Sequence, residues 1–304
     1  MIETRELTKR FGGTTAVEGL TLRVEEGEVF GFLGPNGAGK TTTVRMLTCL
    51  LSKTSGEATI GGFEIGREAD LQSIRKFIGL LPETVGMYDD LSAYKNLDYY
   101  GRLYDCTPEQ RMERIEHFLR MLGLWEKKDV AVGTFSKGMR QKLAIARALI
   151  HEPKVLFLDE PTANLDPEAS KTVRDFILEL KKEKRTIFLN THNLDEAERV
   201  CDRVGILKTR LVALGATNEL LESLWGRRTV IQVSLLNDAI VTAVKKLGPR
   251  RVATEGNRLI VDVGNPSEEN PLLVDAVVAA GGRVELVTEL LPTLEDVYLR
   301  LVRS

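Results

Sequence analysis

The sequence predicts an α/β fold over residues 1–217, followed by a smaller α+β unit over residues 218–304, and three observations carry this prediction. Continuous apolar runs alternate with segments of helical spacing, as in parallel sheets that are covered on both faces. A glycine-rich loop stands between one of these runs and a helical segment. Beyond residue 217 the periodicities follow the order β-α-β-β-α-β, which is typical of a ferredoxin-like unit.

The glycine-rich loop follows the apolar run 29–33 and consists of Gly34, Pro35, Asn36, Gly37, Ala38, Gly39, Lys40, Thr41 and Thr42. Strand, glycine-rich loop and helix in this order make a G-x-x-x-x-G-K-T match a P-loop. Its three glycines allow a tight turn whose N–H groups point inward and form an anion nest. Lys40 adds a mobile positive charge and Thr41 a hydroxyl for magnesium. The loop therefore predicts binding of a nucleoside triphosphate with magnesium.

The composition narrows the compartment and the partners. Lys and Arg number 42 and Asp and Glu 44, so the net charge of −2 gives no sign of a nucleic-acid partner, and none is expected. Cys49, Cys106 and Cys201 form no C-x-x-C pair, which favours reduced cytoplasmic thiols over a disulfide or zinc site. No apolar core of a signal peptide and no run of ~18 apolar residues is found, so a membrane role needs a partner that supplies the spans.

The residues before the loop alternate like strands at 2–9 and 20–24, with a turn at Gly12 and Gly13. Phe11 lies just before that turn. Its ring could stack on a nucleotide base, or it could equally pack beneath the turn.

A helical region is predicted from residue 92 to 125, after a short strand at 77–81 that Pro82 ends. Apolar residues recur there at three and four positions. We interpret two stripes as helix core, and these are Leu97, Tyr100, Leu103 and Tyr104, and Met112, Ile115, Phe118, Leu119 and Leu122.

Ser136 is the predicted N-cap of a helix that runs to Ile150. The first turn of this helix offers free N–H groups together with Lys137 and Arg140, which makes it a favourable place for phosphate.

Two acids end the next buried strand, at residues 155–158, and acids at the carboxyl end of a central parallel strand face the ligand crevice. Asp159 suits magnesium held through water, and Glu160 suits the orientation and deprotonation of an attacking water. An acidic helix cap is the simpler alternative. His192 ends another buried strand, where a histidine is usually structural but near phosphate is a credible γ-phosphate sensor.

In their order these motifs resemble the nucleotide-binding subunit of ABC transporters. The resemblance covers about residues 2–217 and rests on the P-loop, a signature at 135–139, the Asp159-Glu160 pair, the loop from Ala163 to Asp166, and His192. Glu83 stands at the position of the family's glutamine loop. The resemblance implies a P-loop ABC ATPase core, with a mixed sheet, an antiparallel edge subdomain and a helical subdomain.

The resemblance also implies roles for single residues. ATP and Mg²⁺ would be bound, with Glu160, His192 and Lys40 as catalytic residues and Thr41, Glu83 and Asp159 as magnesium ligands. The nucleotide would contact the loop from Gly34 to Thr42 and, outside it, Phe11, Glu83, Ser136, Lys137, Gly138 and Asp166.

Four positions depart from the family pattern. Glu83 replaces the usual glutamine; it can still ligate magnesium but adds a negative charge. Lys137 and Met139 replace a glycine and a glutamine of the signature. Lys137 could offset the charge of Glu83 across an interface, but a solvated lysine is the preferred interpretation. Phe11 replaces a frequent tyrosine and stacks equally well without the hydroxyl.

The tail predicts strands at 229–235, 251–254, 259–263 and 283–287 and helices at 239–247, 272–280 and 294–302. It contains no phosphate or metal motif. Similar extensions occur on ATPase subunits of certain exporters. Ligand sensing, dimerisation and stabilisation are all compatible with this pattern, and dimerisation or packing is the preferred interpretation.

One P-loop, one signature and one switch histidine make half of the family's paired machinery. The resemblance therefore implies an ATPase subunit that hydrolyses ATP to drive a separate membrane-spanning permease, in export. Its second partner would be another ATPase subunit, in a homodimer or a paralogous heterodimer. The chain would be cytoplasmic and peripheral, held to the inner face of the cell membrane through the permease.

A soluble ABC ATPase of the translation or DNA-repair type is the alternative. The translation type usually carries two cassettes and a charged linker, and neither is found here. The repair type inserts a long coiled coil between P-loop and signature, but residues 43–134 hold only a compact helical region. The Asn-Lys-x-Asp of GTPases is also missing. These comparisons favour transport.

Overall fold

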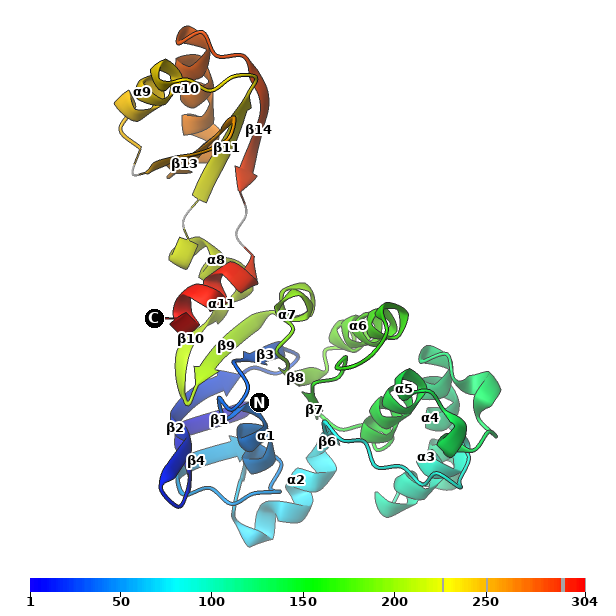
Figure 1. The fold of residues 1–304 in the computed structure, drawn as a ribbon. Helices are drawn as coiled ribbons and strands as arrows, with labels where there is room; N and C mark the ends of the chain where they lie inside the picture. Colours follow the sequence, from blue (N-terminus) through cyan, green and yellow to red (C-terminus); the bar gives the residue numbers. More distant parts are fainter. Residues whose placement is uncertain (226, 250, 291–292, 304) are drawn as a thin grey trace. The chain divides into compact units, whose positions relative to one another are not determined.

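A six-stranded sheet organises the first part of the chain in the computed structural model, which describes residues 1–225, 227–249, 251–290 and 293–303. The order of its strands is β10-β9-β3-β8-β7-β6. Their bounds are Val29–Leu33 for β3, Ile78–Leu81 for β6, Val155–Asp159 for β7, Thr186–Asn190 for β8, Arg203–Lys208 for β9 and Arg210–Ala216 for β10. Figure 1 shows this sheet with the other elements in the colours of the sequence.

Neighbouring strands from β9 to β6 run parallel, and only β10 pairs antiparallel with its neighbour. Strands β3, β7 and β8 are buried along their whole length, which explains why they are continuous apolar runs in the sequence. Their parallel register places their carboxyl ends at one edge, where Asn190 is opposite both Phe32 and Asp159. This edge is where the loop after β3 and the acids after β7 meet.

A second, antiparallel sheet has the order β2-β1-β4-β5. Its strands are β1 (Ile2–Phe11), β2 (Thr14–Val24), β4 (Ser55–Ile60) and β5 (Phe63–Glu64). Helix α1 (Lys40–Leu47) contacts strands of both sheets. The predicted mixed sheet with an antiparallel edge subdomain is confirmed.

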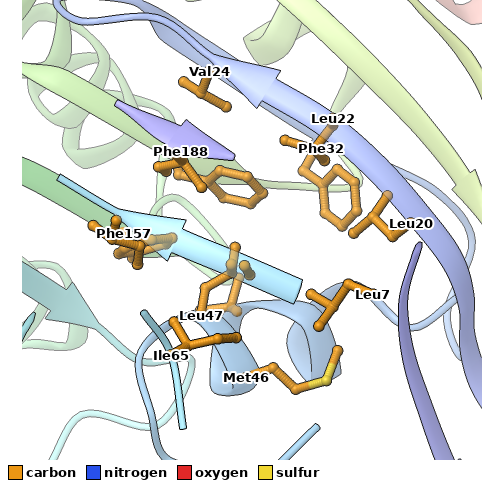
Figure 2. Close-up of a cluster of buried hydrophobic side chains, with 14 of the residues drawn as sticks. Leu7, Leu20, Leu22, Val24, Phe32, Met46, Leu47, Ile65, Phe157 and Phe188 are labelled. Atoms are coloured by element: carbon orange, nitrogen blue, oxygen red, sulfur yellow. The ribbon is translucent and has the colours of Figure 1, made fainter. Parts of the chain in front are cut away.

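One buried cluster joins the two sheets across α1. Figure 2 shows Phe32 of the central sheet beside Leu20 of the antiparallel sheet, and Phe188 belongs to the same cluster. The rings of Phe32 and Phe188 are 5.2 Å apart between centroids. Met46 and Leu47 of α1 belong to the same cluster. The helix that begins at the P-loop lysine is therefore anchored by hydrophobic packing at its far end.

A group of helices follows β6, and α3 (Ala93–Leu103), α4 (Pro108–Met121) and α5 (Lys137–Leu149) contact one another. The predicted helical region is thus divided. Thr107 caps α4 through a capping box and Pro108 occupies its first turn. The remaining helices of this unit are α2 (Leu71–Phe77), α6 (Pro167–Lys182) and α7 (Leu194–Val200), with short 3₁₀ turns at Glu68–Asp70, Trp125–Lys127 and Val132–Thr134.

The assignment of Leu103 and Met112 to the helix core is wrong, because they are 59% and 60% exposed. Leu103 lies in the last turn of α3, where the chain leaves the helix. Met112 is seven residues before buried Leu119, which puts the two on nearly the same side of α4, so its exposure near the start of the helix is not set by helical spacing. The rest of the second stripe, from Ile115 to Leu122, is buried as predicted.

The chain divides into two units, Met1–Ala216 and Thr217–Ser304. The second unit has a four-stranded antiparallel sheet of order β12-β13-β11-β14, with α9 and α10 packed on it. Its elements are α8 (Thr217–Trp225), β11 (Arg227–Val233), α9 (Asp238–Lys246), β12 (Val252–Glu255), β13 (Arg258–Val263), α10 (Pro266–Ala279), β14 (Val284–Leu290) and α11 (Leu294–Arg303). Helices α8 and α11 contact each other. The identification of this unit as ferredoxin-like stays a prediction.

No helix within the described ranges has both the length and the apolar character needed to cross a bilayer.

Candidate active site

The P-loop wraps around the start of α1, and two of its glycines allow close backbone approaches. Gly39 has φ of 100°, and a Cβ there would lie 2.2 Å from the carbonyl oxygen of Ala16. A Cβ at Gly34 would lie 2.3 Å from the carbonyl oxygen of Leu207. Any larger residue at either position would push the loop away from β2 or β9.

The amine of Lys40 is buried inside this loop. Its Nζ donates to the carbonyl oxygens of Gly34, at 2.8 Å, and Pro35, at 3.3 Å. Burial lowers the pKa of Lys40, against the opposite effect of the nearby Glu160, Asp159 and Glu83 carboxylates. The Lys40 ammonium group is therefore the positive charge near three carboxylates, and its hydrogen bonds to two carbonyl oxygens fix its position.

A cavity of about 280 Å³ opens beside the loop. It is lined by Ala16, Asn36, Gly37, Ala38, Gly39, Lys40, Thr41, Thr42, Glu83 and Glu160. The structure thus brings most predicted P-loop residues together with Glu83 and the predicted base. Among the residues that the structure describes, this lining does not include Phe11, Asp159, His192, Asp166 or the segment 136–138.

Asp159 directly precedes Glu160, which lines the cavity, and is almost fully buried. Its carboxylate accepts a hydrogen bond from the side-chain amide of Asn190, on the neighbouring strand. Burial raises the pKa of Asp159, and Glu160 and Glu83 add to this, while the bonds from Asn190 and the Thr41 hydroxyl lower it. A positive charge bound beside Asp159, in addition to that of Lys40, would stabilise the ionised form of this carboxyl group.

Glu160 is placed by an unusual backbone at the end of β7. Its φ is 52°, in the left-handed region, and its N–H donates to the carbonyl oxygen of Asn190 at 2.8 Å. This conformation turns the side chain away from the strand and into the cavity lining. Non-glycine residues in this region are uncommon and are often found at functional sites.

His192 meets Glu160 from the end of β8. Its Nδ1 lies 2.8 Å from Oε2 of Glu160, and its own side chain is 63% exposed while that of Glu160 is 14% exposed. The carboxylate is therefore fixed on one side by the imidazole and free on the other to accept a proton. This is the geometry required of a general base with an orienting partner.

The donors around the cavity suit a small hard cation. The Thr41 hydroxyl lies near the carboxylate of Asp159, and both Thr41 and Glu83 line the cavity. Hydroxyl and carboxylate oxygens, with phosphate oxygens and water, are the ligands that Mg²⁺ prefers. Burial is the main reason that the pKa of Asp159 is raised, and the nearby Glu160 and Glu83 carboxylates add to it; a cation beside these three acids would offset their mutual repulsion.

The predicted signature lies at the start of α5. Ser136 caps the helix, as predicted, and its Oγ accepts from the N–H of Met139 at 3.2 Å. Gly138 faces α6, where a Cβ would lie 3.0 Å from that of Ala169. Asp166 caps α6 and accepts from the N–H of Ala169 at 2.8 Å. Ser136 and Lys137 are exposed, whereas Gly138 is buried.

Helix α5, which begins at the predicted signature, is also hydrogen-bonded to the segment that follows β7. The side-chain amide of Gln141 donates to the carbonyl oxygen of Pro161 at 2.9 Å. Pro161 directly follows Glu160, so α5 and the predicted base share a short connection.

Phe11 is 49% exposed at the turn between β1 and β2. The Nζ of Lys9 lies 5.0 Å from the centroid of its ring and donates to the carbonyl oxygen of Ser52 at 2.6 Å. Of the two interpretations of Phe11, this exposure favours a ring available for stacking over one packed beneath the turn.

Two residues of the site escaped sequence reasoning. Ala16 lines the cavity and its carbonyl oxygen makes the close approach at Gly39, and no sequence pattern reports such a contact. Asn190 holds Asp159 and receives the N–H of Glu160. Asn190 is a polar residue at the end of a buried apolar run, and this pattern could have indicated a residue of the site.

Comparisons with known proteins agree with these motifs. A profile of the ABC transporter family matches residues 17–163. The linearmycin resistance ATP-binding protein LnrL of Bacillus subtilis is 32% identical over 99% of this chain and 98% of its own length. The Nod factor export ATP-binding protein I of Rhizobium sp. is 35% identical over 99% of this chain and 96% of its own length.

A solved structure shares the fold of the first unit. This dimeric bacterial ABC transporter cassette has a TM-score of 0.65 and 27% identity, and the match covers 71% of this chain and 98% of that one.

Proposed function

Because the chain belongs to the ABC transporter family of ATP-binding proteins, we propose that it drives export by hydrolysing MgATP in the cavity beside its P-loop. The chain is an ATPase of this family and serves transport rather than translation or DNA repair. The observation that carries the site assignment is the contact of Glu160 with His192 at the edge of the cavity that Lys40 also lines.

Glu160 is the proposed general base. One oxygen of its carboxylate contacts His192, and its side chain lines the cavity in which the terminal phosphate would lie. A water between this carboxylate and the phosphate would lose its proton to Glu160 as its oxygen attacks the γ-phosphorus, while the bond from that phosphorus to the β–γ bridging oxygen breaks and ADP leaves. Lys40 would leave its two carbonyl partners and bind the phosphate oxygens instead.

Magnesium would be held by Thr41, Asp159 and Glu83, and when bound it would neutralise charge on the phosphate oxygens. This assignment rests on the kinds of donor around the cavity and on the burial of Asp159.

A second ATPase subunit is proposed to complete each site. Ser136 and Lys137 are exposed at the start of a capped helix, which is a favourable place for phosphate, and neither lines the cavity of its own chain. They are thus available to the nucleotide of a partner. The solved cassette that matches the first unit is described as dimeric, which supports pairing here.

The membrane partner and the location follow from the relatives. One is described as a resistance protein and another as an export protein, and these descriptions support export by this chain. We place the chain on the cytoplasmic face of the membrane, where a membrane-spanning permease holds it. Which compound is exported depends on that permease.

Co-purification from membranes tests the transport role. The full chain with an affinity tag is purified from membranes of its own host with magnesium and ATP, using Glu160→Gln to slow dissociation. A polytopic membrane protein in stoichiometric amount is the expected result. Glu57→Gln, at an exposed position on β4, is the matched control. Recovery of only ribosomal or DNA-repair proteins with both variants would contradict the transport role.

A further inference from the structure

A buried acid behind the site has no part in the chemistry described above. Glu196 lies in the first turn of α7 with no exposed surface. Its Oε2 accepts from the hydroxyl of Thr191 at 3.0 Å, while its Oε1 has no hydrogen-bond partner among the described residues. Burying a carboxyl group with an unpaired oxygen is costly, so its presence here needs a reason.

The bonds around Glu196 form a closed ring. The hydroxyl of Thr191 receives the N–H of Asn193 at 3.0 Å and donates to Glu196. The N–H of Glu196 in turn donates to the side-chain oxygen of Asn193 at 3.1 Å. His192 lies between Thr191 and Asn193 in the chain. Its imidazole is not part of this ring of bonds and contacts Glu160 instead.

Glu196 also reaches the segment that carries the base. Its second hydroxyl neighbour is Thr162, two residues after Glu160. Burial raises the pKa of Glu196, and the charge of Glu160 raises it further. The hydroxyls of Thr191 and Thr162 and the charge of Arg174 on α6 act in the opposite direction. The buried carboxyl group of Glu196 is therefore bonded to the loop before α7 and lies near the segment after β7, and these two segments carry His192 and Glu160.

We propose that Glu196 is a positioning residue for hydrolysis, whose bond to Thr191 fixes the loop of His192 and so holds the imidazole against Glu160. This inference rests on the proposed roles of Glu160 and His192. A displacement of about 1 Å in such a pair can cost roughly a hundredfold in rate. The loss would fall on kcat, because neither Glu196 nor Thr191 lines the nucleotide cavity.

Steady-state ATPase kinetics of the full chain test this role. Glu196→Ala and Thr191→Val remove the bond from its two ends, and each is expected to lower kcat about ten- to hundredfold with KM for ATP changed less than about threefold. Glu196→Gln retains an oxygen that can accept from Thr191 and is expected to recover most of the loss. Asp195→Ala is the matched control, because this acid is exposed on the same helix and pairs with Arg199.

Combination with His192→Ala separates positioning from general destabilisation. If Glu196 acts through His192, Glu196→Ala adds less than about threefold to the loss caused by His192→Ala, because coupled residues are not additive. Full multiplication of the two losses would overturn the inference and leave the proposed function intact. Unchanged kcat in both Thr191→Val and Glu196→Ala would do the same. Full activity of His192→Ala itself would instead remove the proposed role of His192, and with it this inference.

Should Glu196→Ala fail to fold, Thr191→Val and Glu196→Gln carry the same test, since both keep the size of the side chain. Thr191→Val must then lower kcat alone and be non-additive with His192→Ala, and any other result overturns the inference.

Discussion

The Nδ1 atom of His192 lies 2.8 Å from Oε2 of Glu160, and the two residues follow the ends of the neighbouring parallel strands β8 and β7. Neither is fixed by the strands alone. Glu160 is turned toward the cavity by its left-handed backbone, and the loop of His192 is held by bonds that involve Thr191, Asn193 and Glu196. The contact thus depends on backbone strain on one side and on buried polar bonds on the other.

The first prediction concerns Glu160. Glu160→Gln removes the proton acceptor with almost no change in shape, so phosphate release is expected to fall by roughly 10²–10⁴ while ATP still binds. An ATP-bound pair of chains should accumulate on size-exclusion chromatography. Glu57→Gln serves as the control, at an exposed position on β4. Normal turnover in Glu160→Gln would assign the base to another residue.

The second prediction concerns Gly39. Gly39→Ala places a Cβ 2.2 Å from the Ala16 carbonyl oxygen, at a φ of 100° that alanine rarely adopts. The left-handed backbone alone costs about 1–2 kcal/mol, and the clash adds to it. Nucleotide affinity in calorimetry is expected to fall at least tenfold. Gly86→Ala is the control, because nothing lies within 4 Å of its added Cβ. Equal affinities in the two variants would contradict this account of the loop.

The third prediction tests whether two chains share each site. Lys40→Ala removes the positive charge that would bind phosphate, and Ser136→Arg blocks the start of α5, where the partner's nucleotide would bind. Each homodimer should therefore have low ATPase activity. In a mixed dimer both lesions fall in one site and the other keeps an intact Lys40 and Ser136. Activity should return, up to about one working site per mixed dimer. Verified heterodimers that are no more active than their parents would argue against independently working shared sites.

The fourth prediction concerns stability in acid. His151 is stacked on Tyr104 with ring centroids 3.8 Å apart, and its Nε2 donates to the carbonyl oxygen of Ile78 at 2.9 Å. Burial lowers the pKa of His151 from 6.5 to about 4, and Arg114 adds to this while the Ile78 bond opposes it. The imidazole is therefore neutral in the folded chain at a pH where the unfolded chain already takes up a proton.

Below pH 6.5 the unfolded state binds more protons at His151, so stability is lost as the pH falls toward 4. At pH 5 the loss would be at most about 2 kcal/mol. His151→Phe keeps the ring stack and cannot titrate, so its urea midpoint should fall less between pH 7.5 and pH 5 than that of the natural chain. Equal falls would show that the shift of His151 has no effect on stability.

The fifth prediction concerns the division of the chain. All residues that line the nucleotide cavity belong to Met1–Ala216. A chain that ends at Ala216 should therefore bind MgATP with an affinity close to that of the full chain, measured by calorimetry. Its circular dichroism spectrum checks that it is folded. A folded shortened chain without nucleotide affinity would overturn the proposal that residues 217–304 are an accessory domain.

Much of the fold could be predicted because its signals are local. The runs at β3, β7 and β8 are buried on both faces and so appear as unbroken apolar segments. The helix start at Ser136 is a side-chain cap, which a short sequence pattern reveals. The P-loop was equally accessible, because its glycines and Lys40 are consecutive in the chain.

The remainder depends on contacts between distant residues. Asn190 matters because its strand lies beside that of Asp159, and Glu196 matters because its carboxylate accepts from Thr191, next to His192. Met112 follows helical spacing but lies on the rim of the buried stripe, where periodicity alone does not decide exposure. The left-handed backbone at Glu160 is set by its neighbours on β8, and its own residue type gives no sign of it.

The bond from Gln141 to the carbonyl of Pro161 has a consequence for a pair of such chains. In the proposed pair, the helix that begins at Ser136 serves the partner's nucleotide, while Pro161 follows the base that serves the chain's own. A shift of that helix on meeting the partner's phosphates would therefore pull on the segment next to Glu160. By thermodynamic linkage the effect is reciprocal, so occupancy of either nucleotide site changes the affinity of the other by the same factor. The amide of Gln141 would then be one carrier of cooperativity between the two nucleotide sites of the proposed pair.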